Sequence, residues 1–210
     1  MFYPLFIELR NRPVLVVGGG PIAERKVDSL LQAEAAVTLV APDLTAHLKQ
    51  LAAAGSIRTE RRKFEEADLE NVLLVISATD DVETQERVAA LARAHGILIN
   101  TVDQPRLCDF IVPAIVRHGD VIAAISTSGK SPALAAALKS KIESVVTKDA
   151  GRAASILGAI RNEVHARFTD PARRKDAFER IVNSGILDWI SQYDDAAALQ
   201  KVCRMIEGLQ

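Results

Sequence analysis

The chain has 210 residues, of which 49% are hydrophobic and 25% are charged, and its formal net charge is −1. This is the composition of an ordinary soluble globular protein with one large domain or two small ones. A nearly neutral chain gives no reason to expect nucleic acid or an anionic membrane as a partner. No apolar run approaches the roughly 20 residues that a membrane-spanning helix needs.

The N-terminal stretch and the number of cysteines favour a cytoplasmic protein. The apolar stretch Met1–Glu8 lacks a basic segment and leads directly into the first strand, so we do not interpret it as a signal peptide. Two cysteines, Cys108 and Cys203, are too few for a disulfide framework. A reducing cytoplasm is therefore the expected compartment.

The first 113 residues alternate apolar strands with helices. Buried strands are predicted at residues 14–17, 37–41, 57–60, 72–77 and 97–102, and helices at 22–33, 44–54 and 82–95. Strands that alternate with helices favour a parallel sheet covered on both faces. The sequence thus predicts an α/β fold with a Rossmann-type parallel sheet in a domain of residues 1–113.

The pattern changes after residue 113. Residues 114–117 and 121–125 flank His118-Gly119-Asp120 and predict a β-hairpin. Ser131 and Pro132 suit the N-cap and first turn of a helix that runs to about Val146. An exposed apolar hairpin invites a partner, so we expect 114–147 to be a dimerisation segment of a homodimer. Residues 148–210 are predicted to form a C-terminal helical domain, interrupted near Asp170-Pro171 and Asn183-Ser184-Gly185.

A glycine-rich turn follows the first strand. Gly18, Gly20 and Ala23 fill the G-x-G-x-x-G/A positions of a dinucleotide-binding turn, with a strand before it and a helix after it. Pro21 suits the first helical position, and the helix N-terminus favours a pyrophosphate. The alternative is a tight strand-to-helix turn without a ligand. We predict the cofactor-binding residues listed here: Gly18, Gly19, Gly20, Pro21, Ile22, Ala23, Pro42, Asp43, Ala78 and Thr79.

Asp43 stands at the end of the second strand. Its distance from the glycine turn is close to the ~20 residues typical of a carboxylate that binds the adenosine ribose. A carboxylate there repels a 2′-phosphate, which favours NAD over NADP. The alternative is that Asp43 caps the following helix.

The fourth and fifth strands end in polar residues, at the sheet edge where ligands bind in such folds. Ala78 and Thr79 are expected near the cofactor, whereas Asp80 and Asp81 are interpreted as helix N-terminal carboxylates rather than catalysts. Asp103, after the fifth strand, is the candidate acid or base, because a partly shielded carboxylate there can exchange a proton. A turn-forming aspartate is the equal alternative.

The remaining reactive side chains, those of cysteine and histidine, do not indicate a further catalytic or metal site. Cys108 has no histidine near it in sequence and is expected to be a small buried residue rather than a nucleophile. His47, His95, His118 and His165 are scattered, and none has metal-ligand spacing to another histidine or a cysteine. We therefore expect no fixed metal site.

A hydroxyl-rich loop precedes the helix that begins at Pro132. It combines serine and threonine hydroxyls, Lys130 and a helix N-terminus, which together suit carboxylates of an acidic substrate. The alternative is an N-capped loop without a ligand. The expected substrate-binding residues are Asn100, Ser126, Thr127, Ser128, Lys130 and Ser131.

Taken in order, these motifs resemble one family. The chain is similar to precorrin-2 dehydrogenase in a series of segments. These are Pro4-Leu-Phe, the glycine turn through Lys26, Ser77 to Asp81, Asn100 to Asp103 with Cys108-Asp-Phe110 and Pro113-Ala114, and Ser126 to Pro132. The same module forms the N-terminal part of multifunctional siroheme synthases. The match spans residues 4–140, and the helical tail fits the family in layout more than in motif.

The resemblance implies an NAD-dependent oxidation of precorrin-2, a tetrapyrrole, to sirohydrochlorin, and in some members ferrous iron insertion to siroheme. It implies a homodimer, dinucleotide contacts at Pro21, Ile22, Pro42 and Asp43, and Asp103 as the catalytic group. It also implies that the hydroxyl-rich loop borders the substrate pocket. Because the sequence ends at Gln210, a separate methyltransferase is expected to supply precorrin-2.

Two other functions compete with this one. The first is a different NAD-dependent oxidoreductase with a helical substrate domain. The second is an NAD-binding regulatory or sensor module, such as those of potassium transport systems. A sensor needs the glycine turn and the ribose carboxylate but neither Asp103 nor the hydroxyl-rich loop.

Overall fold

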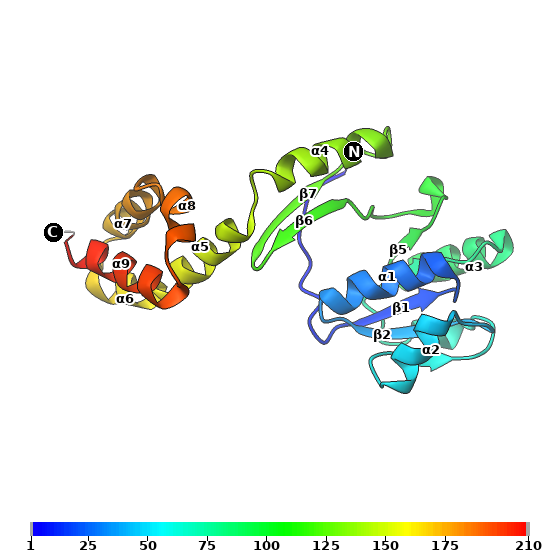
Figure 1. Cartoon of the computed structure of the whole chain (residues 1–210). Coiled ribbons are helices and arrows are strands. Elements are labelled where there is room, and N and C mark those ends of the chain that lie inside the picture. Colours follow the sequence, from blue (N-terminus) through cyan, green and yellow to red (C-terminus); the bar gives the residue numbers. More distant parts are fainter. Residues whose placement is uncertain (1, 209–210) are drawn as a thin grey trace. The chain divides into compact units, whose positions relative to one another are not determined.

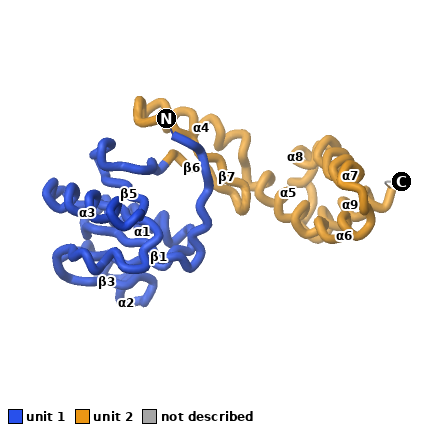
Figure 2. Tube along the Cα trace, turned by 180° about the vertical axis from the view of Figure 1, so that it is seen from behind, with its two compact units in different colours: residues 1–112 blue, residues 113–210 orange. Residues whose placement is uncertain are grey.

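The computed structural model describes residues 2–208. Its contacts divide the chain into two compact units, Met1–Val112 and Pro113–Gln210 (Figure 2). The boundary falls beside the predicted end of the first domain at residue 113. The segments 114–147 and 148–210 fall within one unit, and their division into a dimerisation segment and a separate helical domain stays a prediction.

The first unit is a five-stranded parallel sheet with the strand order β3-β2-β1-β4-β5. This confirms the predicted Rossmann-type α/β fold (Figure 1). Two short 3-10 helices, η1 and η2, occupy segments for which the sequence predicted no element. The elements are β1 (Pro13–Val17), α1 (Pro21–Gln32), β2 (Ala36–Val40), α2 (Ala46–Ala53), β3 (Arg58–Glu60), η1 (Glu66–Leu69), β4 (Leu74–Ser77), α3 (Val82–Ala94), β5 (Leu98–Thr101) and η2 (Pro105–Leu107).

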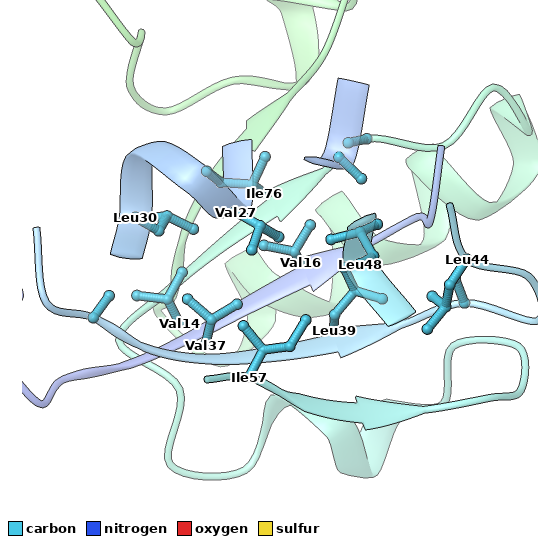
Figure 3. Packing of buried hydrophobic residues seen from close by; sticks show 14 of the residues in the cluster. Val14, Val16, Val27, Leu30, Val37, Leu39, Leu44, Leu48, Ile57 and Ile76 are labelled. Carbon is cyan, nitrogen blue, oxygen red and sulfur yellow. The ribbon is translucent and has the colours of Figure 1, made fainter. Parts of the chain in front are cut away.

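Both faces of the sheet are buried by helices. Successive side chains of a strand point to opposite faces, so each strand contributes to both clusters. Val14 and Val16 of β1 pack with α1 and α2 on one face (Figure 3). Leu15 and Val17 pack with Val88 and its neighbours in α3 on the other. Full burial of each such side chain stabilises the fold by about 1.5–3 kcal/mol. The strand ends are thereby held in fixed positions.

The second unit begins with the predicted hairpin, formed by β6 (Ala114–His118) and β7 (Val121–Ile125). Gly119 turns the chain with φ of 57°. Helix α4 (Pro132–Glu143) follows, and Ser131 caps it by accepting a hydrogen bond from the Leu134 N–H at 3.1 Å. The helix ends before the predicted Val146, and none of its residues is buried within this chain.

Helices fill the rest of the second unit around a core of isoleucine, valine and alanine side chains. The predicted interruptions are confirmed by Asp170, which caps α7, and by Gly185, which has φ of 77°. Within residues 2–208, no helix is both long and apolar enough to cross a membrane. The elements are α5 (Lys148–Ala159), α6 (Arg161–Arg167), α7 (Pro171–Asn183), α8 (Ile186–Trp189), η3 (Ile190–Gln192) and α9 (Asp195–Glu207).

Candidate functional site

A pocket of about 630 Å³ lies at the carboxyl ends of the strands in the first unit. The strand order reverses between β1 and β4, and the crevice at such a reversal is where open α/β sheets bind ligands. The turns after all five strands reach the pocket. Its lining comprises residues 17–22, 40–43, 62–64, 78–82, 84–85 and 102–104.

The glycine turn is packed tightly on one side and open on the other. A Cβ on Gly18, whose φ is 121°, would lie 2.4 Å from the Ala78 carbonyl oxygen, and one on Gly19 would lie 1.9 Å from the Asp43 carbonyl oxygen. A Cβ on Gly20 would meet nothing within 4 Å, although Gly20 lines the pocket. The first two glycines therefore fix the turn, and the third keeps open space beside it.

This open space lies at the N-terminus of α1. Gly20 is the N-cap, and Pro21 occupies the first turn. Because glycine has no side chain to cap the helix, the first N–H groups of α1 are left for a ligand. An anion is favoured there by the N–H groups and by the partial positive charge of the helix end. The turn therefore fits the pyrophosphate of a dinucleotide.

The last position of the motif is part of the core. Ala23 is a fully buried residue of α1 and does not line the pocket. A small residue here lets the helix pack closely on the strand, which is the structural role of the third position in such turns. Ile22 both lines the pocket and packs against the core.

Asp43 lies exposed at the pocket rim and does not cap α2. Thr45 is the cap, since its Oγ1 accepts a hydrogen bond from the Leu48 N–H at 3.2 Å. The alternative interpretation of Asp43 as the helix cap is therefore wrong. Its carboxylate is available to a ligand in the pocket.

The end of β4 carries one feature that the sequence patterns did not predict, the buried Gln85, and one that agrees with the prediction, Asp81 at the N-terminus of α3. Gln85 of α3 is 5% exposed, and its Nε2 donates to the Thr79 carbonyl oxygen at 2.6 Å. Its Oε1 has no hydrogen-bond partner within the described part of the chain. Asp81 is the N-cap residue of α3, and the hydroxyl of Thr84 donates to its carboxylate. This hydrogen bond holds the pKa of Asp81 below its usual value.

Positive charge reaches the pocket from the segment after β3. Arg62 is held by Asp68 through two hydrogen bonds of 2.6 and 2.9 Å. Burial raises the pKa of Asp68, but the bonds from Arg62 and from the Glu65 N–H outweigh burial and lower the pKa below its usual value. Lys63 also lines the pocket, and its charge contributes to the lowered pKa of Asp81. Motif reasoning missed this segment.

Asp103 lines the same pocket as the glycine turn. It sits in the turn after β5 with φ of 59°, and the side chain is exposed. The Val102 N–H donates to the Ser77 carbonyl oxygen at 2.9 Å, which ties this turn to β4. Lys26 of α1 is the nearby cation. Burial lowers the pKa of Lys26 most and the charge of Arg25 lowers it further, while the charge of Asp103 acts to raise it.

Asn100 and Cys108 lie behind this turn. Asn100 is 8% exposed, and its Nδ2 donates to the Phe110 carbonyl oxygen at 2.9 Å. Cys108 is half-buried, as expected of a small packing residue, and burial raises the pKa of its thiol. Neither residue lines the pocket. A role for Asn100 in substrate binding stays a prediction.

The hydroxyl-rich loop belongs to the second unit. Thr127 Oγ1 bonds to the Ser131 N–H and to the Ser131 carbonyl oxygen, each at 3.0 Å, and Ser131 caps α4. The Ser128 N–H donates to Ser126 Oγ at 2.9 Å. Lys130 is exposed. The loop is thus an ordered N-capped turn, and its role in binding carboxylates stays a prediction.

Two family models match the chain. Residues 5–114 match the putative NAD(P)-binding family, and residues 149–206 match the sirohaem synthase dimerisation region. The chain belongs to the putative NAD(P)-binding family. The match covers the sheet, the glycine turn and Asp103. The matched dimerisation region lies within the predicted C-terminal helical domain and does not overlap 114–147, the segment that the sequence predicted to dimerise.

The chain is also similar to proteins named siroheme synthase. The chain is 38% identical to a siroheme synthase of Pseudoalteromonas translucida over 207 residues, which are 99% of this chain and 44% of that protein. It is 41% identical to a siroheme synthase of Thioalkalivibrio sulfidiphilus over 197 residues, 93% of this chain and 40% of that protein. The chain thus spans less than half the length of these relatives.

A solved structure matches nearly the full length of the chain. The structure titled SirC, precorrin-2 dehydrogenase has a TM-score of 0.74 and 28% identity, with 98% of this chain and 99% of that chain covered. The fold predicted from the sequence is therefore confirmed beyond the sheet, and so is the resemblance to the precorrin-2 dehydrogenase family.

Proposed function

We propose that this protein catalyses the NAD-dependent dehydrogenation of precorrin-2 to sirohydrochlorin. The observation that carries the proposal is Asp103, an exposed carboxylate on the pocket that the glycine turn also lines. The pocket thus combines a place for a hydride acceptor with a proton acceptor. The relatives named siroheme synthase and the structural match named precorrin-2 dehydrogenase support this substrate and reaction.

The proposed cofactor is NAD, which when bound accepts the hydride. The backbone of Gly18–Gly20 and the N-terminus of α1 receive its pyrophosphate, and Ile22, Ala78 and Thr79 lie along the same pocket. Asp43, beside Pro42 on the rim, accepts hydrogen bonds from the hydroxyls of the adenosine ribose and repels a 2′-phosphate. These residues therefore bind and orient NAD in preference to NADP.

The proposed role of Asp103 is to hold the proton that leaves the substrate. Dehydrogenation removes one hydride, which carries two electrons, and one proton, so a single carboxylate beside the reacting ring suffices. Asp103 is exposed in the free chain. A large tetrapyrrole over the pocket shields this carboxylate from water and favours proton uptake.

The substrate carries many carboxylates. The hydroxyl-rich loop offers exposed Ser126, Ser128 and Lys130 in front of the N-terminus of α4. Hydroxyls, an ammonium group and helix N–H groups all favour carboxylates. We assign the loop the role of holding the acidic side chains of the tetrapyrrole.

Assembly and compartment are also proposals. Helix α4 buries none of its residues within the chain, and Leu134 and Leu138 on it are 52% and 37% exposed. A second copy that covers this helix makes a homodimer. The name of the matched dimerisation region, residues 149–206, supports a homodimer, although that region does not include α4. The free thiols of Cys108 and Cys203 suit the reducing cytoplasm, where NAD is available.

Substitution of Asp103 tests the proposed reaction. Asp103→Asn keeps the size of the side chain and removes the proton acceptor. We expect turnover of precorrin-2 under anaerobic conditions to fall at least 100-fold, within the range typical of general bases, with unchanged affinity for NAD. An Asp80→Asn variant, on the same pocket wall, serves as the matched control and is expected to keep turnover. Wild-type turnover in Asp103→Asn contradicts the assigned role.

The same assay separates the competing functions. A folded protein that binds NAD but forms neither NADH nor sirohydrochlorin is a sensor module, or an oxidoreductase for another substrate. Ferrous iron insertion, which the resemblance implies for some members, is measured by adding ferrous iron to sirohydrochlorin and comparing the rate with a protein-free control.

A further inference from the structure

The segment Cys108–Phe110 covers the open edge of the sheet. Because β5 is the last strand in the sheet order, the backbone groups on its outer side have no neighbouring strand. The Asp109 N–H donates to the Ile99 carbonyl oxygen at 2.8 Å, and Asp109 Oδ2 accepts the Ile99 N–H at 3.3 Å. The segment therefore takes the place of a sixth strand.

At Thr101 the partner is a thiol. The Thr101 N–H donates to Cys108 Sγ at 3.2 Å, and Cys108 Sγ donates to the Thr101 carbonyl oxygen at 3.1 Å. The Gln104 carbonyl oxygen lies 3.4 Å from the same sulfur, so the two carbonyl oxygens share the single S–H proton. One side chain thus contacts the backbone on both sides of Asp103. A thiol is a weak donor and a weak acceptor, so it can accept from the Thr101 N–H and donate to a carbonyl oxygen at the same time.

The turn needs this support. Asp103 has φ of 59°, a conformation that non-glycine residues seldom adopt and that the surrounding structure must hold. Within the described residues, the backbone hydrogen bonds of residues 102–104 run from the Val102 N–H to Ser77, from the Gln104 N–H to Thr101 at 3.3 Å and from the Leu107 N–H to Gln104 at 2.9 Å, and none of them involves the N–H or carbonyl of Asp103. Burial raises the pKa of Cys108, which keeps the proton on the sulfur for donation.

We propose that Cys108 is a positioning residue for Asp103, because its thiol bridges Thr101 and Gln104 and so holds the carboxylate over the pocket. The role of Asp103 in precorrin-2 oxidation, on which this inference rests, is the proposed function above. Among the described residues, the hydrogen-bond partners of the thiol are Asn100, Thr101 and Gln104, and none of them belongs to the glycine turn or to the rim at Asp43. Loss of the thiol therefore alters turnover and leaves NAD binding intact.

Two variants remove the bridge. Cys108→Ala deletes the side chain beyond Cβ, and Cys108→Val keeps apolar bulk without hydrogen bonds. We expect kcat for precorrin-2 to fall about tenfold or more in both, since a displacement of about 1 Å can cost 100-fold. KM for NAD is expected to stay within about twofold of wild type, since the glycine turn is unaltered.

A conservative variant and a matched control separate positioning from simple packing. Cys108→Ser restores a group that both donates and accepts, so it is expected to recover most of kcat. Cys203→Ala removes the other thiol, on α9, whose Sγ lies 3.7 Å from Glu163 Oε2, and it is expected to match wild type. Melting temperatures show which variants are folded. Wild-type kcat in folded Cys108→Val overturns the proposal, even where Cys108→Ala does not fold.

Hydrogen exchange of the Thr101 amide tests the bridge without the reaction. We expect faster exchange in Cys108→Val than in wild type and protection regained in Cys108→Ser. Unchanged exchange in Cys108→Val overturns the bridge. A wild-type protein that binds NAD but does not oxidise precorrin-2 overturns the proposed function instead, and the exchange measurement still decides whether the thiol holds the turn.

Discussion

The glycines of the turn differ in what a methyl group would meet, and this difference predicts opposite outcomes for Gly18 and Gly20. In Gly18→Ala the new Cβ lies 2.4 Å from the Ala78 carbonyl oxygen, at a residue with φ of 121°. Overpacking costs about 1–3 kcal/mol, and a strained backbone conformation costs a similar amount, about 1–3 kcal/mol. We expect the free energy of unfolding of the first unit to fall by about 3 kcal/mol, taken from the same ranges.

Gly20→Ala is predicted to behave in the opposite way. Its φ of −84° suits alanine, and a Cβ there meets nothing within 4 Å. Alanine is a poorer N-cap than glycine, so a stability loss of at most about 1 kcal/mol is expected. The methyl group occupies the open space at the N-terminus of α1. We expect affinity for NAD to fall about tenfold, or about 1.4 kcal/mol.

Thermal melting and calorimetric titration with NAD distinguish these cases. At about 4 °C per kcal/mol for a domain of this size, Gly18→Ala lowers Tm by about 12 °C and Gly20→Ala by less than about 4 °C. Gly55→Ala, with φ of 72° and nothing within 4 Å, is the control for backbone strain away from the pocket. Wild-type affinity for NAD in a folded Gly20→Ala protein refutes the assignment of the pyrophosphate to this turn.

Three further predictions follow from single side chains. Asp43→Ser removes the charge that repels a 2′-phosphate, so the ratio of NADP to NAD affinity is expected to rise about tenfold or more, measured by titration with each cofactor. Asp68 has a pKa below that of the unfolded chain, so its contribution to stability is present above about pH 4 and is lost as pH falls further. Arg62→Gln is expected to flatten this loss in melts between neutral and acid pH. Arg152→Ala breaks hydrogen bonds to Asp149, Asp195 and two backbone carbonyl oxygens, so the second unit is expected to unfold at a lower denaturant concentration while the first unit is unchanged.

Much of the first unit could be predicted because its signals are local. Runs of β-branched residues mark β1, β2 and β4, and the glycine turn with Pro21 marks the change from strand to helix. The ends of elements were less certain, since they depend on capping. Helix α2 begins at Ala46 because the hydroxyl of Thr45 caps it, and a pattern of apolar residues does not distinguish Thr45 from Asp43 as the cap.

The pocket wall could be predicted only in part. Residues that follow a strand directly, such as Asp43 and Asp103, are located by the strand order. Gln85 and the segment 62–64 reach the pocket through the packing of α3 and of the chain after β3, and no motif marks them. The thiol of Cys108 meets Thr101 because segment 108–110 runs along β5 in one register, and a sequence pattern does not specify that register.

The most direct test of the central claim is one anaerobic mixture of the wild-type protein, precorrin-2 and NAD. The absorbance of NADH and of sirohydrochlorin is followed together. The proposed function predicts that both rise at the same rate and in equal amounts, because each dehydrogenation transfers one hydride. A folded protein that binds NAD and yields neither product contradicts it.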